Sequence, residues 1–187
     1  MKLFVRGLVL LLVVFSLVSC KKVLKQEELP ANIVLGNSYY TQVDMRYEKD
    51  YFLTTNYRRG TSIPVNTKVT INKITGNTIE VGVDVFPKPF LIKNIQKHTG
   101  DDIFQTFDKL FARKKLNLRN FNSLERKNIR NGSVAKRMRK KAVIAAIGYP
   151  PITETMSLEV NSWVYWSARF NKFRVNFKNG RVSSIVD

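Results

Sequence analysis

Hydrophobic and polar residues alternate between residues 65 and 85, on both sides of the turn Thr75-Gly76-Asn77. Alternation with a period of two is typical of strands that bury one face of a sheet, so this stretch predicts a β-hairpin. Aromatic and β-branched residues at Tyr39–Thr41 and Tyr51–Thr55 predict further strands. Residues 36–98 are therefore expected to contain about four to six short strands.

Apolar residues then recur with helical spacing over Ile103–Phe111, after a segment at Thr99 that has the composition of a helix N-terminus. A second helix is predicted to begin at Asn122, because Glu125 three residues later completes a capping-box pair. It is expected to end near Gly132.

The C-terminal part predicts one more helix and three strands. The helix should end at Gly148, since a glycine and the two prolines shortly after it favour termination. Trp163–Trp166 is aromatic and β-branched, residues 173–178 alternate, and Asn179-Gly180 is a strong hairpin signal that leads into residues 181–186. These runs predict a three-stranded antiparallel meander.

The order of the C-terminal residues resembles the BamE/SmpA/OmlA family of bacterial outer-membrane lipoproteins. The resemblance implies a domain of two helices packed on a three-stranded antiparallel sheet, and a role as an accessory piece of envelope assemblies rather than as an enzyme. One departure is Arg137-Met138-Arg139, where the family has Gly-Met-Thr. The residues that carry the resemblance are Met138, Val143, Gly148, Pro150, Trp163, Tyr165, Val175, Phe177, Asn179, Gly180, Val182 and Ile185.

Together these patterns predict an α+β chain with a small β-rich module, resembling SH3-like modules, followed by a BamE-like two-helix, three-stranded domain. The expected segments are a lipoprotein signal peptide at 1–19 and a tether at 20–35. The β-rich module would occupy 36–98, and a helical connector with the BamE-like domain would occupy 99–187.

The N-terminus indicates the compartment. Lys2 and Arg6 precede an apolar run from residue 8 to residue 18, which is too short to span a bilayer but suits a signal peptide. Leu17-Val18-Ser19-Cys20 resembles a bacterial lipobox, so Cys20 is expected to become the acylated first residue of the mature protein. The alternative is an ordinary signal peptide or uncleaved anchor in which Cys20 is incidental. Lys21 is not the aspartate associated with inner-membrane retention in some bacteria, so the family resemblance implies the outer membrane, facing the periplasm.

The chain is strongly basic, with a formal charge of +18 at pH 7. From Lys109 to Lys141 there are thirteen Lys or Arg residues and a single acid, Glu125. Such a field favours anionic partners, here anionic lipid, lipopolysaccharide or peptidoglycan, whereas the compartment argues against nucleic acid. The candidate anion-binding residues are Arg137, Arg139, Lys140 and Lys141. The alternative interpretation is a set of solvated helix faces.

Aromatic residues near the C-terminal strands are candidates for a protein interface, since Trp and Tyr are enriched at binding hot spots. We single out Tyr149, Trp163 and Trp166, together with the loop between residues 152 and 162. The alternative is ordinary core packing. Three neighbouring rings of one strand cannot all face the same side, so one is expected to be partly exposed.

Catalytic chemistry finds little support. Cys20 is the only cysteine and His98 the only histidine, so no thiolate or zinc site can be assembled from the sequence, and no cofactor is expected. His98 is expected in a loop or helix cap. The sequence therefore predicts a non-catalytic envelope lipoprotein that is an accessory or scaffold component of a protein assembly. The alternative is a lipid-anchored module that binds peptidoglycan or lipopolysaccharide.

Overall fold

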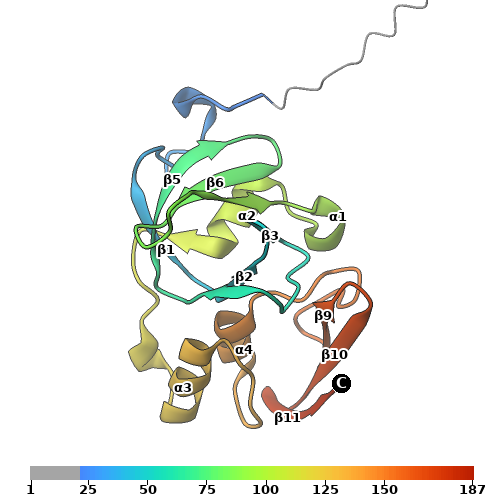
Figure 1. Cartoon of the computed structure of the whole chain (residues 1–187). Helices are drawn as coiled ribbons and strands as arrows, with labels where there is room; N and C mark the ends of the chain where they lie inside the picture. Colours follow the sequence, from blue (N-terminus) through green and yellow to red (C-terminus); the bar gives the residue numbers. More distant parts are fainter. Residues whose placement is uncertain (1–21) are drawn as a thin grey trace, which may run out of the picture.

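A computed structural model describes residues 22–187, and a curled sheet of six strands dominates it (Figure 1). Strand β3 runs parallel to β7, whereas the other neighbours are antiparallel, so the sheet is mixed. A separate pair of short strands, β2 (Met45–Tyr47) and β4 (Thr61–Ile63), lies beside it. In spatial order the six strands are β3 (Tyr51–Leu53), β7 (Phe90–Lys93), β6 (Thr78–Gly82), β5 (Lys68–Ile74), β1 (Ser38–Thr41) and β8 (Phe111–Ala112).

The predicted hairpin at residues 65–85 is confirmed by β5 and β6. Their alternation buries Val69, Ile71, Ile79 and Val81 in the first of two hydrophobic cores. A register shift between Ile71 and Lys73 adds one residue to β5, and Ile74 thereby returns to the buried face.

The sheet curls around helix α2 (Ile103–Leu110), which follows the short helix α1 (Gln96–Thr99) (Figure 1). Ile103, Phe107 and Leu110 of α2 are buried in the same core as the strands. Asp102 caps α2, since its carboxylate accepts hydrogen bonds from the backbone N–H groups of residues 104 and 105 at 2.8 Å each. The apolar periodicity therefore located this helix, although its cap is Asp102 rather than Thr99.

Most of the segment predicted as a tether packs on the sheet. The backbone N–H of Leu24 donates to the carbonyl oxygen of Ile74 at 2.9 Å, and Val23 forms a bridge with Thr75. After the 3₁₀ turn Gln26–Glu28, Leu29 and Ile33 enter the first core. The folded body therefore begins only three residues after Cys20.

A second core lies among the C-terminal elements. It is formed by helices α3 (Ser123–Asn131) and α4 (Lys140–Ile147) and a sheet in the order β11-β10-β9. The strands are β9 (Ser162–Ala168), β10 (Asn171–Lys178) and β11 (Arg181–Val186), and a 3₁₀ turn (Leu118–Asn120) precedes α3. The predicted start and end of α3 are confirmed: Asn122 and Glu125 form the capping box, and Gly132 closes the helix in a left-handed conformation.

Buried polar contacts join the two cores. The side-chain amide of Asn56 donates to the carbonyl oxygens of Ile147 at 2.7 Å and Tyr149 at 2.9 Å. Nearby, the buried carboxylate of Asp44 binds the guanidinium of Arg58, and its own backbone N–H donates to the carbonyl oxygen of residue 145 at 3.0 Å. Ile144 packs against both cores.

The predicted fold class is wrong. The described chain is mostly sheet, with a curled six-stranded mixed sheet and about 21% helix in four helices, and it does not match a BamE-like two-helix, three-stranded domain after an SH3-like module. One physical reason is β8, which comes from the region predicted as a helical connector and pairs with β1. The other is that Asn56, Asp44 and Arg58 fasten the C-terminal elements to the sheet. Those elements are therefore part of a larger packed body.

Candidate functional site

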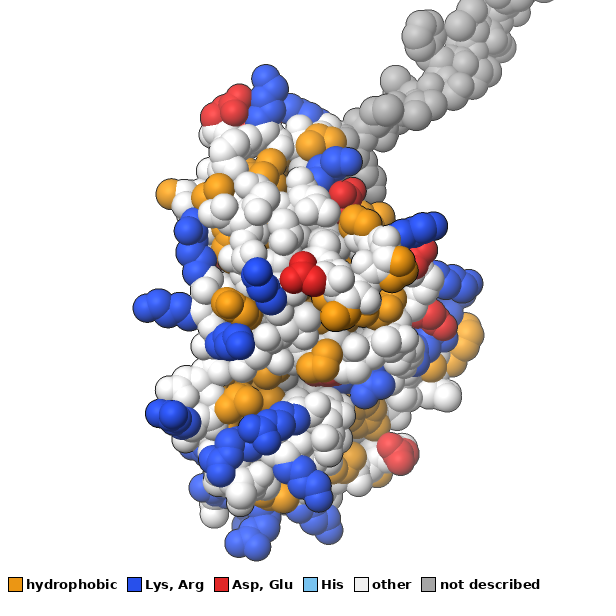
Figure 2. All heavy atoms as spheres, turned by 60° about the vertical axis from the view of Figure 1, so that its left-hand side comes forward, with side chains coloured by type: hydrophobic (Ala, Val, Ile, Leu, Met, Phe, Trp, Pro, Cys, Tyr) orange, Lys and Arg blue, Asp and Glu red, His pale blue; other side chains and the backbone are white. Residues whose placement is uncertain are grey.

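Positive charge is distributed unevenly along the described chain. Residues 22–108 contain eleven Lys or Arg and ten Asp or Glu, whereas residues 109–187 contain eighteen and four. Lys and Arg side chains crowd the end of the molecule that carries α3 and the β10–β11 turn (Figure 2). The described chain begins at the opposite end, beside β5 and β6 (Figure 1). A cluster of exposed cations therefore marks the end of the molecule that carries α3 and the β10–β11 turn.

Arg139, a predicted anion-binding residue, is engaged inside the protein. Its Nε donates to Oε1 of Glu125 at 2.8 Å, and its backbone N–H donates to the same oxygen at 3.0 Å. Glu125 is buried, and the hydrogen bond from the Arg139 side chain lowers the pKa of its carboxyl group to about 2. Arg139 therefore neutralises an internal carboxylate at the start of α4.

Lys140 also makes internal contacts. Its ammonium group donates to the carbonyl oxygens of Leu158 at 2.8 Å and Glu159 at 2.9 Å, and it lies 5.4 Å from the ring centroid of Trp163. These contacts hold the loop before β9 against α4. Lys141 is exposed, and its ammonium group lies 5.7 Å from the ring centroid of Phe121.

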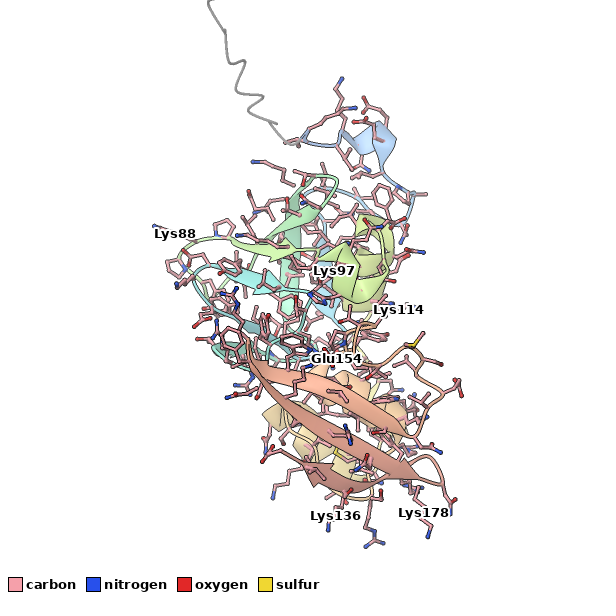
Figure 3. All side chains as sticks on the ribbon, turned by 90° about the vertical axis from the view of Figure 1, so that its right-hand side faces the viewer. Lys88, Lys97, Lys114, Lys136, Glu154 and Lys178 are labelled. Atoms are coloured by element: carbon pink, nitrogen blue, oxygen red, sulfur yellow. The ribbon has the colours of Figure 1, made fainter. Side chains whose placement is uncertain are left out.

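Arg137, another predicted anion-binding residue, is exposed. It lines an open groove together with Lys136, Arg181 and the first residues of α3. Lys178 lies at the same end of the molecule as Lys136 (Figure 3). We define the distal basic surface as the six exposed cations Lys127, Arg130, Lys136, Arg137, Lys178 and Arg181. Five of them were not among the predicted anion-binding residues, because α3, Lys136 and the β10–β11 turn are brought together only by the fold.

The three predicted interface aromatics do not form one surface. Trp163 is fully buried and packs against Phe177 with ring centroids 4.6 Å apart. Trp166 is half-buried, with the ring of Tyr57 5.7 Å away and the ammonium group of Lys172 4.9 Å from its centroid. The packing alternative thus describes Trp163, while Trp166 is the partly exposed ring of β9.

Tyr149 lines a small cavity of about 40 Å³ beside the first core. Burial raises the pKa of its phenol, and the ammonium group of Lys109 lies 5.1 Å from its ring. Lys109 in turn pairs with Asp101 at 2.6 Å, so the charges beside the cavity are matched. The hydroxyl of Thr106, buried in the cavity wall, has no protein partner. A space of this size holds water rather than a substrate.

His98 makes a structural contact: its Nδ1 and the hydroxyl oxygen of Thr153 are 2.9 Å apart. The described hydrogen bonds give this ring no carboxylate to orient it, as a catalytic triad requires. Within residues 22–187, no group of three or more metal-ligating side chains is gathered in one place. No helix of this region is long and apolar enough to cross a bilayer. The predicted lipidation site, Cys20, lies outside the described residues.

Comparison of the chain with known protein families, with curated proteins and with solved structures finds no match.

Proposed function

We propose that this chain is a non-catalytic lipoprotein of the bacterial envelope, anchored through Cys20 in the outer membrane and facing the periplasm, where it is an accessory or scaffold component of a protein assembly. The observation that carries the proposal is the polarity of the body. The first described residues dock on the sheet three residues after Cys20, and a cluster of exposed cations lies at the other end.

Because Val23 pairs with Thr75, an anchor at Cys20 would fix the orientation of the folded body at the membrane. Three residues of extended chain reach at most about 11 Å, so an acylated Cys20 holds the β5–β6 end of the body at the membrane surface. Two or three acyl chains make such attachment effectively permanent. A body held in one orientation suits a scaffold better than a freely diffusing enzyme.

Exposed apolar side chains on the loop before β9 support a protein partner. Ile152, Met156 and Val160 are 41%, 93% and 44% exposed. Apolar side chains gathered on one loop are typical of contact sites for another protein, here another envelope protein.

Mass spectrometry of the N-terminal peptide of the mature protein tests the anchor. We expect a peptide that begins at Cys20 and carries acyl groups, and we expect Cys20→Ser to abolish the modification and release the protein from membranes. An unmodified Cys20 in a protein recovered outside the membrane fraction would remove the proposal.

A photo-crosslinker at Met156 tests the scaffold role, with Val85 (81% exposed) as the matched control position. The role requires one envelope protein to be captured from position 156 and not from position 85.

A further inference from the structure

We infer that the distal basic surface binds an extended anionic polymer with phosphate or carboxylate groups along its length, and not the bilayer that holds the anchor. The inference rests on the proposed function for the direction of the anchor. The surface itself is defined by the fold, because α3, the connector before α4 and the β10–β11 turn each contribute two of its six cations.

The end of the body nearest Cys20 is poorly suited to an anionic bilayer. Lysines at this end lie beside acids: Lys22 pairs with Glu28, Lys73 pairs with Glu80 at 3.5 Å, and the charged groups of Lys25 and Glu27 are 3.9 Å apart. The six cations of the distal basic surface have no ion-pair partner among the described salt bridges, and the one buried acid nearby, Glu125, is neutralised by Arg139. The attraction for anions is therefore concentrated away from the anchor.

Distance separates the two ends electrostatically. A compact body of this length is roughly 40 Å across, and salt screens charges within about 8 Å at physiological ionic strength. Lys136 and Lys178 lie at the end of the body opposite to the first described residues (Figure 3). The electrostatic potential of the anchoring leaflet is therefore screened at the distal basic surface, which faces away from the membrane.

The backbone at Arg137 is an independent sign of function. Its φ of +76° lies in the left-handed region, which favours glycine; most of the other non-glycine residues with positive φ are Asn or Asp. Two backbone hydrogen bonds hold the strained connector on β11, from the N–H of Arg137 to the carbonyl oxygen of Val182 at 2.7 Å and from the N–H of Val182 to the carbonyl oxygen of Met138 at 2.8 Å. Arg137 therefore occupies a backbone conformation that glycine would adopt with less strain.

The groove beside Arg137 suits a chain of anionic groups. Its volume is about 630 Å³, and it is open to solvent between the start of α3 on one side and Lys136, Arg137 and Arg181 on the other. A volume of this order accommodates several linked groups rather than a single ion. Lys178, Lys127 and Arg130 extend the positive field beyond the groove.

The test uses the chain from residue 20 with Cys20→Ser, which keeps every described residue and removes the acyl group. Binding is measured by fluorescence anisotropy to two labelled probes, inorganic polyphosphate and poly-glutamate, which separate phosphate from carboxylate recognition. Co-sedimentation with phosphatidylglycerol vesicles measures bilayer binding. The distal variant combines Lys136→Gln, Arg137→Asn and Lys178→Gln, and asparagine suits the left-handed backbone. The matched control combines Lys68→Gln, at the start of β5, with Lys88→Gln and Lys97→Gln, and so removes three exposed charges. Figure 3 shows Lys88 and Lys97 far from Lys136 and Lys178.

We expect salt-sensitive binding to at least one polymer, weakened about tenfold or more in the distal variant and less than about twofold in the control. Absence of polymer binding at low salt, equal loss in the two variants, or binding to vesicles alone would overturn the inference. Because the assay contains no acyl group, failure here leaves the anchor proposal standing, and failure of the anchor test leaves the polymer measurement valid.

Discussion

Glu125 is the acid on which the geometry around Arg139 depends, and its replacement gives a measurable prediction. The carboxylate accepts hydrogen bonds from the side chain and backbone N–H of Arg139 and from the backbone N–H of Asn122. These donors favour the ionised form and lower the pKa of Glu125 from 4.5 to about 2. A shift of this size corresponds to at most about 3 kcal/mol, and solvent around the partly exposed Arg139 reduces it, so we expect about 1–2 kcal/mol.

The sign of the pH dependence follows from linkage. Because the folded pKa lies below the unfolded one, the stabilisation is present above pH 4.5 and is lost as the pH falls from there towards 2. Urea unfolding followed by tryptophan fluorescence should therefore show Glu125→Gln less stable than the parent by about 1–2 kcal/mol at pH 7. The difference should shrink steadily below pH 4.5. Glu159→Gln, an exposed acid outside the described ion pairs, is the control. A difference that stays constant with pH would refute the assigned role of the ion pair.

Three further predictions concern the polar contacts of Asp44 and Arg58 between the two cores and the strained backbone at Arg137. Gly132→Ala should lower the unfolding free energy by about 1–3 kcal/mol. A Cβ at this position would lie 2.8 Å from Oδ1 of Asp44, and the backbone φ of +59° disfavours a side chain. Gly76→Ala, with no atom within 4 Å of the added Cβ, should change the unfolding free energy little. Asp44→Asn should lower the free energy of urea unfolding by about 3–5 kcal/mol, because it leaves the guanidinium of Arg58 buried without its counter-charge. An unchanged urea midpoint would show that this ion pair does not stabilise the contact between the two cores. Arg137→Gly should raise the thermal midpoint by relieving about 1 kcal/mol of backbone strain, and should at the same time weaken polyphosphate binding; a lower midpoint would contradict the strain.

Local chemistry allowed several elements to be predicted from sequence. The alternation on either side of Thr75-Gly76-Asn77 identified β5 and β6, and the Asn122–Glu125 pair identified the start of α3. Asn179-Gly180 identified the β10–β11 turn, where both residues have positive φ. Each of these signals acts within a few residues, so the rest of the fold does not alter it.

Pairings between distant segments could not be predicted in this way. The parallel partnership of β3 with β7 and the recruitment of β8 to β1 depend on how the sheet closes, which no short pattern encodes. The prediction of the fold class was wrong for this reason. Asn56 looks in sequence like an ordinary loop residue, yet its amide joins the two cores through Ile147 and Tyr149.

The candidate site was predicted in part. The excess of Lys and Arg after residue 108 points to the part of the chain that contributes most of the distal basic surface, and Arg137 lies on that surface. Charge counting could not separate cations that face solvent from those used internally. Arg139 and Lys140 proved to be internal because Glu125 and two carbonyl oxygens happen to lie within their reach.

Depth-dependent fluorescence quenching measures which end of the anchored body faces the membrane. Cys20 is the only cysteine, so a fluorophore can be attached at Gly76→Cys or at Lys178→Cys in the acylated protein on vesicles that contain a lipid-borne quencher. We predict strong quenching at position 76, next to the docked Val23–Thr75 bridge, and none at position 178. Strong quenching at position 178 with none at position 76 would place the basic end on the bilayer and contradict the account.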